Sequence, residues 1–432
     1  MLFMKNKNRM KRWIIYWRRS LIRAVKWLYP GMRVKRWILL CATGISLVGL
    51  GSVKALSGGG TSSIIWGAVL MFMGVISVVV GMKSMVKTFI TILLPEREKE
   101  LVNIIFKKRH LEKGPKIVVI GGGTGLSVLL RGLKDYTSNI TAIVAVADDG
   151  GSSGRLRQEF DVIPPGDLRN CLVALADAEP LMRDLFQYRF SKGSGLDGHN
   201  FGNLFITALS QVTGDFERAI KESSRVLAIR GKVIPSTLSK VKLEAEYNDG
   251  TTSSGETNIT ATTSRGPIKR IWLDPLHCRG STDAIQAIKS AEAIIFGPGS
   301  LYTSILPNLL IKDIRDAVNH SLGLKIYVCN VMTQFGETDQ YTAVDHVNAL
   351  LSHGGLYKID YCIVNTAEVP VSILSRYQEE KAYPVLVDSK AIQQLQCQVI
   401  QEEAISTLNY IRHDPEKLSK IIIDTILDSR YG

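Results

Sequence analysis

The stretch from Lys116 to Leu126, which reads KIVVIGGGTGL, constrains the fold more than any other part of the chain. Four apolar, mostly β-branched residues at 117–120 are typical of a buried strand, and a helical pattern follows the glycines. Glycine accepts positive φ and lets the backbone approach a ligand closely. A helix that starts at such a turn directs its free N–H groups and the positive end of its dipole at the same space, which favours phosphate. The residues predicted to form this phosphate site are Gly121, Gly122, Gly123, Thr124 and Gly125.

The match of this stretch to the dinucleotide-binding fingerprint is incomplete. Gly121 and Gly123 supply the first two glycines, but Leu126 stands where the third glycine belongs. The phosphate-loop signature also fails, because no Gly-Lys-Ser/Thr follows. A tight turn with a purely structural role is the alternative interpretation of this segment.

The formal net charge of +13 is concentrated at one end of the chain. Residues 1–36 contain twelve Lys or Arg and no acid, and Lys54, Lys83 and Lys87 follow before the first acidic residue. This leaves a net charge of −2 for residues 88–432. The near-neutral main body argues against a nucleic-acid partner. The basic N-terminal region favours contact with anionic lipid.

The six cysteines are scattered along the chain and include no Cys-x-x-Cys pair. Structural zinc is therefore not expected, and a disulfide framework is not indicated. A reducing cytosol is the simplest compartment for the main body.

Two apolar runs near the N-terminus predict a transmembrane helical hairpin over residues 37–83. The runs at 37–53 and 55–82 carry no charge, and the first would span about 25 Å as a helix, against about 30 Å of hydrocarbon. Lys and Arg flank the outer ends, whereas the loop holds only Lys54. The positive-inside rule then predicts a two-pass protein of the cell membrane, with both termini and the main domain cytoplasmic. The alternatives are a buried soluble hairpin and a signal peptide, which the long basic region and the second apolar run disfavour.

The chain therefore divides into four parts. Residues 1–36 form a basic cytoplasmic or interfacial segment, in which 11–29 has the spacing of a basic amphipathic helix. A solvated basic tail is the alternative for this segment. The hairpin follows, then a juxtamembrane connector at 84–114, then a main domain at 115–432.

The main domain has the pattern of an α/β fold. Strands at 117–120 and 141–147 are separated by a helix, which implies a right-handed parallel βαβ unit. Further strands at 293–296, 325–330 and 361–365 also end in Gly or Asn. In doubly wound sheets, ligands bind beyond the carboxyl ends of the strands. The predicted fold is a doubly wound Rossmann-like parallel sheet, with the site at that edge.

Residues 232–274 differ from this pattern. Their polarity alternates, and an Asn-Asp-Gly turn interrupts them, so antiparallel hairpins are expected. Because no long apolar face is evident, we expect a β-rich insertion in the Rossmann-like domain.

Polar residues at the strand ends are the next site candidates. An acid at the end of the second strand of such folds binds ribose hydroxyls, and Asp148 and Asp149 stand there. A second strand, glycine turn and helix follow at 293–304 and suggest a second phosphate contact. The candidates from the later strand ends are Gly297, Gly299, Ser300, Thr303, Asn330 and Thr333.

Two motifs place polar residues at the starts of otherwise apolar helices. In PPGDLRN, Asp167 is expected to cap the helix, which leaves Arg169 and Asn170 in its first turn unexplained. In GHNFGNL, His199 and Asn203 are four residues apart and can share a helical face. A pocket role is expected for Asn170, His199 and Asn203, although a lone histidine is more often a surface or satisfied core residue.

Six motifs occur in order: GGGTGLS, ADDGGSSGRLR, PPGDLRNCL, GHNFGNL, GPGSLYTSILPNLL and CNVMTQFGET. Together they make residues 115–430 resemble the gluconeogenesis factor family, whose relative is 2-phospho-L-lactate transferase of deazaflavin coenzyme biosynthesis. The resemblance implies a Rossmann-like homodimer with a nucleotide-diphosphate site at the strand ends. It also implies binding of UDP-sugars such as UDP-N-acetylglucosamine. A role in cell shape and envelope synthesis during gluconeogenic growth is implied too, beside the proteins that build the envelope.

Two functions follow from this resemblance. The first is a membrane-tethered UDP-sugar-binding regulator, in which the glycine turns cradle phosphates, Asp148 or Asp149 binds ribose or metal, and Asn170, His199, Asn203 and Asn330 orient the base or sugar. The second is an enzyme that transfers a phospholactyl group from a nucleotide diphosphate donor, with Mg²⁺ held by Asp148 and Asp149. The motifs ADDGGSSGRLR and PPGDLRN and the β-rich insertion look more like the gluconeogenesis factor branch, which favours the regulator. A nicotinamide-dependent oxidoreductase is the weakest alternative, because the fingerprint is incomplete.

Overall fold

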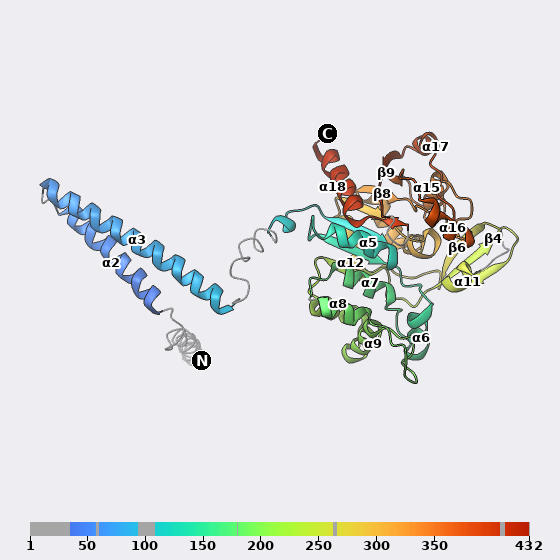
Figure 1. Ribbon diagram of the computed structural model, residues 1–432, viewed down its shortest axis with the longest axis horizontal. Coiled ribbons are helices and arrows are strands. Elements are labelled where there is room, and N and C mark those ends of the chain that lie inside the picture. The colour runs from blue at the N-terminus through green and yellow to red at the C-terminus, as the bar shows by residue number, and fades with distance from the viewer. Residues whose placement is uncertain are drawn as a thin grey trace, which may run out of the picture. The chain divides into compact units, whose positions relative to one another are not determined.

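The computed structural model describes residues 35–57, 60–93, 109–178, 180–261, 266–406 and 411–431. They belong to two compact units, Met1–Phe106 and Lys107–Gly432, each of which is described by itself (Figure 1). The basic segment up to residue 34, which includes the predicted helix at 11–29, lies outside the described residues. Residues 94–108 of the expected connector lie outside them as well.

The first unit is a hairpin of two long helices, α2 (Lys35–Leu56) and α3 (Gly60–Leu93). Both are long and apolar enough to cross a membrane. Helix α3 continues ten residues beyond the predicted end of the hairpin at 83. The helices meet at glycines: a Cβ on Gly44 would lie 2.7 Å from the carbonyl oxygen of Gly74, and a Cβ on Gly51 would lie 2.7 Å from that of Gly67. This close backbone approach is the packing that small residues permit between apolar helices.

The second unit is built on one parallel sheet of seven strands. In spatial order these are β10 (Gln398–Glu402), β9 (Tyr361–Asn365), β8 (Leu324–Val328), β7 (Ala293–Phe296), β1 (Ile117–Gly121), β2 (Ile140–Val144) and β3 (Lys232–Pro235). Strand β1 is buried along its whole length because it lies inside the sheet, with helices covering the faces. Its last residues pair with both neighbours, Ile120 with Ile143 of β2 and with Phe296 of β7. The predicted doubly wound α/β architecture is confirmed.

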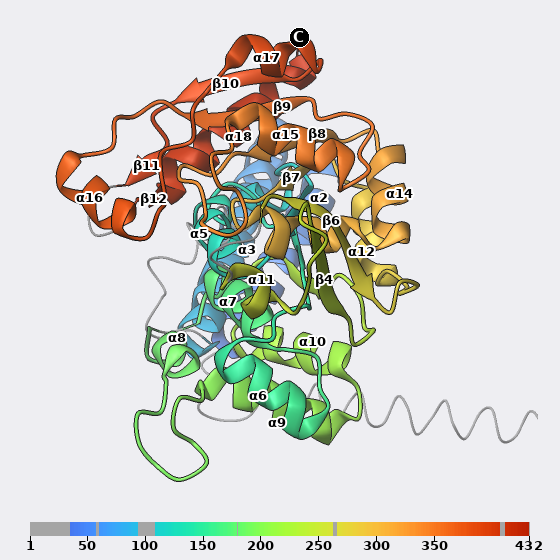
Figure 2. The same ribbon diagram turned by 90° about the vertical axis from the view of Figure 1, so that its right-hand side faces the viewer.

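Helices connect the strands of this unit, and five of them follow one another between β2 and β3. Those before the insertion are α5 (Thr124–Leu133), α6 (Gly151–Phe160), α7 (Gly166–Leu175), α8 (Pro180–Gln187), α9 (Phe201–Thr213) and α10 (Phe216–Val226). Those after it are α12 (Thr282–Lys289), the π-helix η1 (Leu301–Ile305), α13 (Leu306–Leu309), α14 (Lys312–His320), α15 (Ala343–Ser352), α16 (Val371–Glu379), α17 (Ser389–Gln394) and α18 (Pro415–Tyr431). Helices α6, α8, α9 and α10 gather at one end of the unit (Figure 2).

The insertion is a second, antiparallel sheet in the order β5 (Thr252–Ser254), β4 (Lys242–Tyr247), β6 (Ile268–Asp274), with the short helix α11 (Glu256–Thr260). The predicted start near 232 is wrong, because β3 pairs in parallel with β2 and closes that edge of the main sheet. The insertion also has the apolar face that the alternating sequence concealed: Leu243, Ala245 and Tyr247 are buried in the main hydrophobic core.

Helix α18 closes the unit by packing on α5. The Asp414 carboxylate caps this helix by accepting hydrogen bonds of 3.0 Å from the N–H groups of Glu416 and Lys417. The Ser419 hydroxyl donates to the carbonyl oxygen of Leu129 at 3.5 Å. The two helices come so close at Gly132 that a Cβ there would overlap the carbonyl oxygen of Pro415.

We therefore expect Gly132→Ala to push α18 away from α5 and to lower the free energy of unfolding by about 1–3 kcal/mol. Gly266→Ala is the matched control, since the nearest atom to its Cβ is 3.8 Å away, and it should change stability by less than about 0.5 kcal/mol. Urea unfolding of both variants measures the difference. Equal losses would contradict this contact between the helices.

Candidate functional site

The strand order of the main sheet reverses between β1 and β7. The chain proceeds outward from β1 to β2 and β3, and then returns to β7 on the other side of β1. Open α/β sheets bind ligands at such a switch point, beyond the carboxyl ends of the strands. A cavity of about 340 Å³ lies here, between the turns that follow β1 and β7. We call it the switch-point pocket. The sequence-predicted residues that line it are Gly123, Thr124, Gly125, Gly299, Ser300 and Asn330.

The turn after β1 contains glycine because neighbouring parts of the protein leave no room for a side chain there. None of its glycines has positive φ, whereas Gly297 and Gly299 of the second turn have φ of 80° and 152°. A Cβ on Gly123 would overlap Asp167, and one on Gly125 would overlap the carbonyl oxygen of Pro298. Gly121, Gly122 and Gly297 are buried behind the pocket and do not line it. The glycines therefore let helix α7 and the turn after β7 come close to the turn after β1.

The first turn of α5 supplies hydrogen-bond donors to the pocket. The helix begins at Thr124, and Gly123 before it offers no side-chain cap. Among the described residues, the N–H groups of Thr124, Gly125 and Leu126 have no acceptor. Free N–H groups and the positive end of the helix dipole make such a terminus a binding site for anions.

Hydrogen-bond donors that follow the turn after β7 already have an acceptor within the protein. The buried Glu337 carboxylate accepts hydrogen bonds from the Tyr302 N–H at 3.3 Å and from the Thr303 hydroxyl at 3.1 Å. Burial raises the pKa of Glu337 to about 7. Thr303 thus faces Glu337 and does not line the pocket, whereas Ser300 does and accepts from the Gln334 amide at 2.8 Å. The two turns differ: the first offers N–H donors and the second offers hydroxyl groups.

Asp148 and Asp149, the carboxylates predicted to hold ribose or metal, both accept hydrogen bonds from the backbone. Asp148 accepts from the N–H of Gly150 at 2.9 Å. Asp149 accepts from the N–H and the hydroxyl of Thr257, at 3.0 and 2.9 Å, and so fixes the start of α11. Neither lines the switch-point pocket. Within the described ranges, no three His, Cys, Asp or Glu side chains gather in a way that could hold a metal ion.

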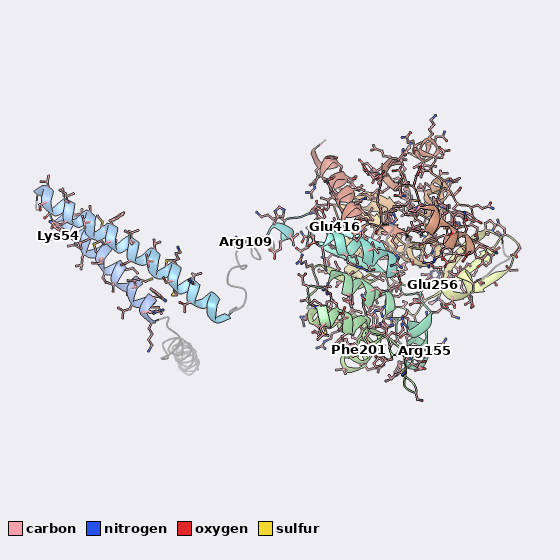
Figure 3. All side chains as sticks on the ribbon, in the orientation of Figure 1. Lys54, Arg109, Arg155, Phe201, Glu256 and Glu416 are labelled. Carbon is pink, nitrogen blue, oxygen red and sulfur yellow. The ribbon has the colours of Figure 1, made fainter. Side chains whose placement is uncertain are left out.

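Two other candidates, His199 and Asn203, lie at the contact between helices α6 and α9. His199 Nδ1 lies 3.2 Å from the Ser152 hydroxyl, and the Asn203 amide donates to the same hydroxyl at 3.2 Å. All three side chains are buried, and burial lowers the pKa of His199. Arg155 and Phe201, labelled in Figure 3, mark the neighbouring helices α6 and α9. His199 and Asn203 therefore join α6 to α9 and do not line the pocket.

Asn170 and Thr333 likewise lie outside the switch-point pocket. Asn170 accepts a hydrogen bond of 2.6 Å from the Arg169 guanidinium and lines a neighbouring cavity. Thr333 is buried and pairs with Tyr383: its N–H donates to the Tyr383 carbonyl at 2.7 Å, and its hydroxyl accepts from the Tyr383 N–H at 2.9 Å.

Sequence reasoning missed two acids of the pocket wall. The prediction that Asp167 caps α7 is wrong: Pro165 holds the N-cap position, and Asp167 lies in the first turn, against Gly123. Burial raises its pKa to about 7, and the charge of Asp148 acts in the same direction. Glu256 comes from the insertion, which gave no signal of a role in the site (Figure 3). Burial first, and then the neighbouring acids, raise its pKa to about 9. A protonated carboxyl can donate a hydrogen bond to an anion.

Further pocket residues come from the C-terminal part of the chain. They are Gln334, Tyr377, Arg412 and His413. Burial lowers the pKa of His413 to about 4, so its imidazole is neutral at physiological pH. The pocket therefore combines backbone donors, amides, hydroxyls and carboxyls with an apolar side formed by Val128, Val331, Met332 and Ile411.

Comparison with known proteins agrees with this geometry. The family model described as 2-phospho-L-lactate transferase CofD matches residues 117–405. The gluconeogenesis factor of Bacillus subtilis is 50% identical over 72% of this chain and 98% of its own length. The chain belongs to the gluconeogenesis factor family. A member from Nostoc sp. is 46% identical over 94% of this chain and 93% of its own length, so that match extends into the N-terminal region.

Solved structures of this gluconeogenesis factor family share the Rossmann-like unit. A crystal structure of a protein from Bacillus halodurans has a TM-score of 0.70 and 47% identity, and it covers 72% of this chain and 100% of its own. That protein corresponds in extent to the second unit, so a domain of this kind folds without the helical hairpin.

The position of Asp167 makes anion binding dependent on pH. Its pKa of about 7 means that it is mostly neutral at pH 6 and mostly charged at pH 8, where it would repel an anion at the start of α5. We expect the affinity for inorganic pyrophosphate, relative to that of Asp167→Asn, to fall about three- to tenfold from pH 6 to pH 8. Calorimetric titration of both proteins measures this ratio. A ratio independent of pH would show that Asp167 does not meet the anion.

Proposed function

We propose that this protein is a membrane-tethered regulator that binds a nucleotide sugar of the UDP-sugar class in the switch-point pocket. Its biological role in this proposal is the control of cell shape and envelope synthesis during growth on gluconeogenic carbon sources. The observation that carries the proposal is the uncapped first turn of α5 at the point where the strand order reverses. A diphosphate is the ligand group that such a terminus suits best.

The rest of the pocket supports a ligand with both polar and apolar parts. Ser300, Asn330 and Gln334 offer hydroxyl and amide groups for a sugar or a base, and Met332 and Tyr377 offer apolar surface. The volume of about 340 Å³ falls within the range of about 300–1,000 Å³ that is usual for small-ligand sites. In this proposal the diphosphate lies at Thr124 and Gly125. Asp167 and Glu256, neutral or partly neutral near pH 7, then donate hydrogen bonds to it.

Transfer of a phospholactyl group from a nucleotide diphosphate donor is the second candidate function, because the matching family model bears the name of that transferase. We rank this transfer below ligand binding because of Asp148 and Asp149, the predicted Mg²⁺ ligands. Neither carboxylate lines the switch-point pocket, and each accepts a hydrogen bond from the backbone. Ligand binding, by contrast, needs only the groups that line the pocket, so we rank it first.

Binding of UDP-N-acetylglucosamine to the full chain in detergent tests the proposal by titration calorimetry. Gly125→Ala should weaken binding at least about tenfold, because its Cβ overlaps Pro298 and forces the two turns apart. Ser300→Ala, which keeps the turn intact, should weaken it about threefold through a lost hydrogen bond. Gly266→Ala should bind as the wild type does.

No binding of any UDP-sugar at millimolar concentration would overturn this proposal. Product formed from a deazaflavin alcohol and an activated phospholactate donor by the same preparation would favour the transferase instead. A loss of binding in Gly266→Ala equal to that in Gly125→Ala would show that the loss does not come from the turn.

We also propose that the hairpin spans the cell membrane, with both termini and the main domain cytoplasmic. Helix α2 is about 33 Å long, which matches a hydrocarbon core of about 30 Å. Large apolar side chains stand exposed on both helices, such as Leu39 at 69% and Phe72 at 68%, which suits a lipid environment. In this proposal the main domain forms homodimers beside envelope-synthesis proteins and has no nucleic-acid partner.

Cell fractionation tests the tether. The full chain should sediment with membranes, resist extraction by high salt or carbonate, and dissolve in detergent. A chain that begins at Arg109 should stay in the soluble fraction, as a solved relative of the same extent folds on its own. Release of the full chain by salt alone would contradict a membrane-spanning hairpin.

A further inference from the structure

A second cavity adjoins the switch-point pocket and is lined by arginine. It has a volume of about 240 Å³ and shares Thr124 and Arg412 with the switch-point pocket. Its other charged residues are Arg131 of α5, Arg169 of α7 and Arg189, which follows α8. No Asp or Glu lines it. We call this cavity the arginine pocket.

Arg169 is the buried member of this group. Its side chain is only 9% exposed, and its stem packs on Gly202, where a Cβ would lie 2.8 Å from its Cδ. One terminal nitrogen donates to Asn170 at 2.6 Å, but the buried Nε has no hydrogen-bond partner in the described part of the chain. An unsatisfied buried donor costs about 1–3 kcal/mol, and more if the group is charged. A ligand oxygen that accepts from this guanidinium would remove that cost.

The charges of the arginine pocket are not balanced from within. Burial first, and then the charge of Arg189, lower the pKa of Arg169 to about 10. Asp167 and Asp148 oppose this shift only in part. Among the described residues, Arg131, Arg169 and Arg189 form no ion pair with a carboxylate. The like charges therefore gather around a space that an anion would stabilise.

We propose that the arginine pocket binds an oxyanion group, phosphoryl or carboxylate, of a small metabolite. Guanidinium groups present paired N–H donors that match the oxygens of both groups. Two sources have this chemistry: a free phosphorylated metabolite, or an anionic substituent on the nucleotide sugar itself. The shared wall at Thr124 and Arg412 lets one ligand extend across both cavities. The second source rests on the function proposed above, whereas the first does not.

Exposed members of the group allow a test that leaves the core intact. Arg131→Gln and Arg189→Gln each remove one charge from an exposed side chain. Arg218→Gln, an exposed arginine of α10 that does not line the pocket, is the control of equal charge. Inorganic phosphate is titrated into the full chain in detergent at constant salt. We expect the wild type and the control to bind alike, and each pocket variant to bind at least about tenfold more weakly.

Two further titrations distinguish the sources. If the ligand is separate, phosphate binds unchanged when UDP-glucose is already saturating. If the oxyanion belongs to the nucleotide sugar, UDP-glucuronic acid binds at least about tenfold more tightly than UDP-glucose, and Arg189→Gln removes this advantage. Either result supports the arginine pocket and names its occupant.

Equal phosphate affinity in the wild type and both pocket variants, together with no preference for UDP-glucuronic acid, would overturn the inference. Failure of UDP-glucose and UDP-N-acetylglucosamine to bind would instead sink the function proposed above. That failure would leave the phosphate titration as an independent test of the arginine pocket.

Discussion

The close approach of the two glycine turns is the constraint on which the pocket depends. Strands β1 and β7 pair in register, so the turns that follow them leave the sheet edge side by side. A side chain on Gly125 would overlap the carbonyl oxygen of Pro298, and one on Gly123 would overlap Asp167. The glycines thus serve the packing of the protein's own backbone. The pocket is the space that this packing leaves at the start of α5.

This packing distributes charge unequally around the pocket. Glu337 satisfies the start of η1, whereas the first turn of α5 is left with free donors. The acids of the wall do not cancel those donors, since burial raises the pKa of Asp167 to about 7 and that of Glu256 to about 9. An anion here would therefore meet backbone N–H groups and carboxyls that are neutral or partly neutral near pH 7, with the guanidinium groups of the arginine pocket beside it.

Local sequence patterns predicted the parts of the fold that depend on neighbouring residues. The strand, turn and helix at 117–133 could be recognised because burial on both faces demands an apolar run and the turn demands glycine. Strand β3 could not, because its four residues precede an alternating pattern that belongs to another sheet. Asp167 looked like a cap because a sequence does not show which distant turn packs against a helix start.

Asp149 shows how a residue at the predicted edge of a sheet can act on a site that it does not touch. The sequence placed it beside the ligand, but its carboxylate holds Thr257 through two hydrogen bonds. Thr257 lies in the first turn of α11, next to Glu256 of the pocket wall. The carboxyl end of β2 thereby fixes the insertion against the site. Because the insertion contributes Glu256 to the pocket wall, the ligand proposed above would also contact the part of the domain that interrupts the Rossmann-like order.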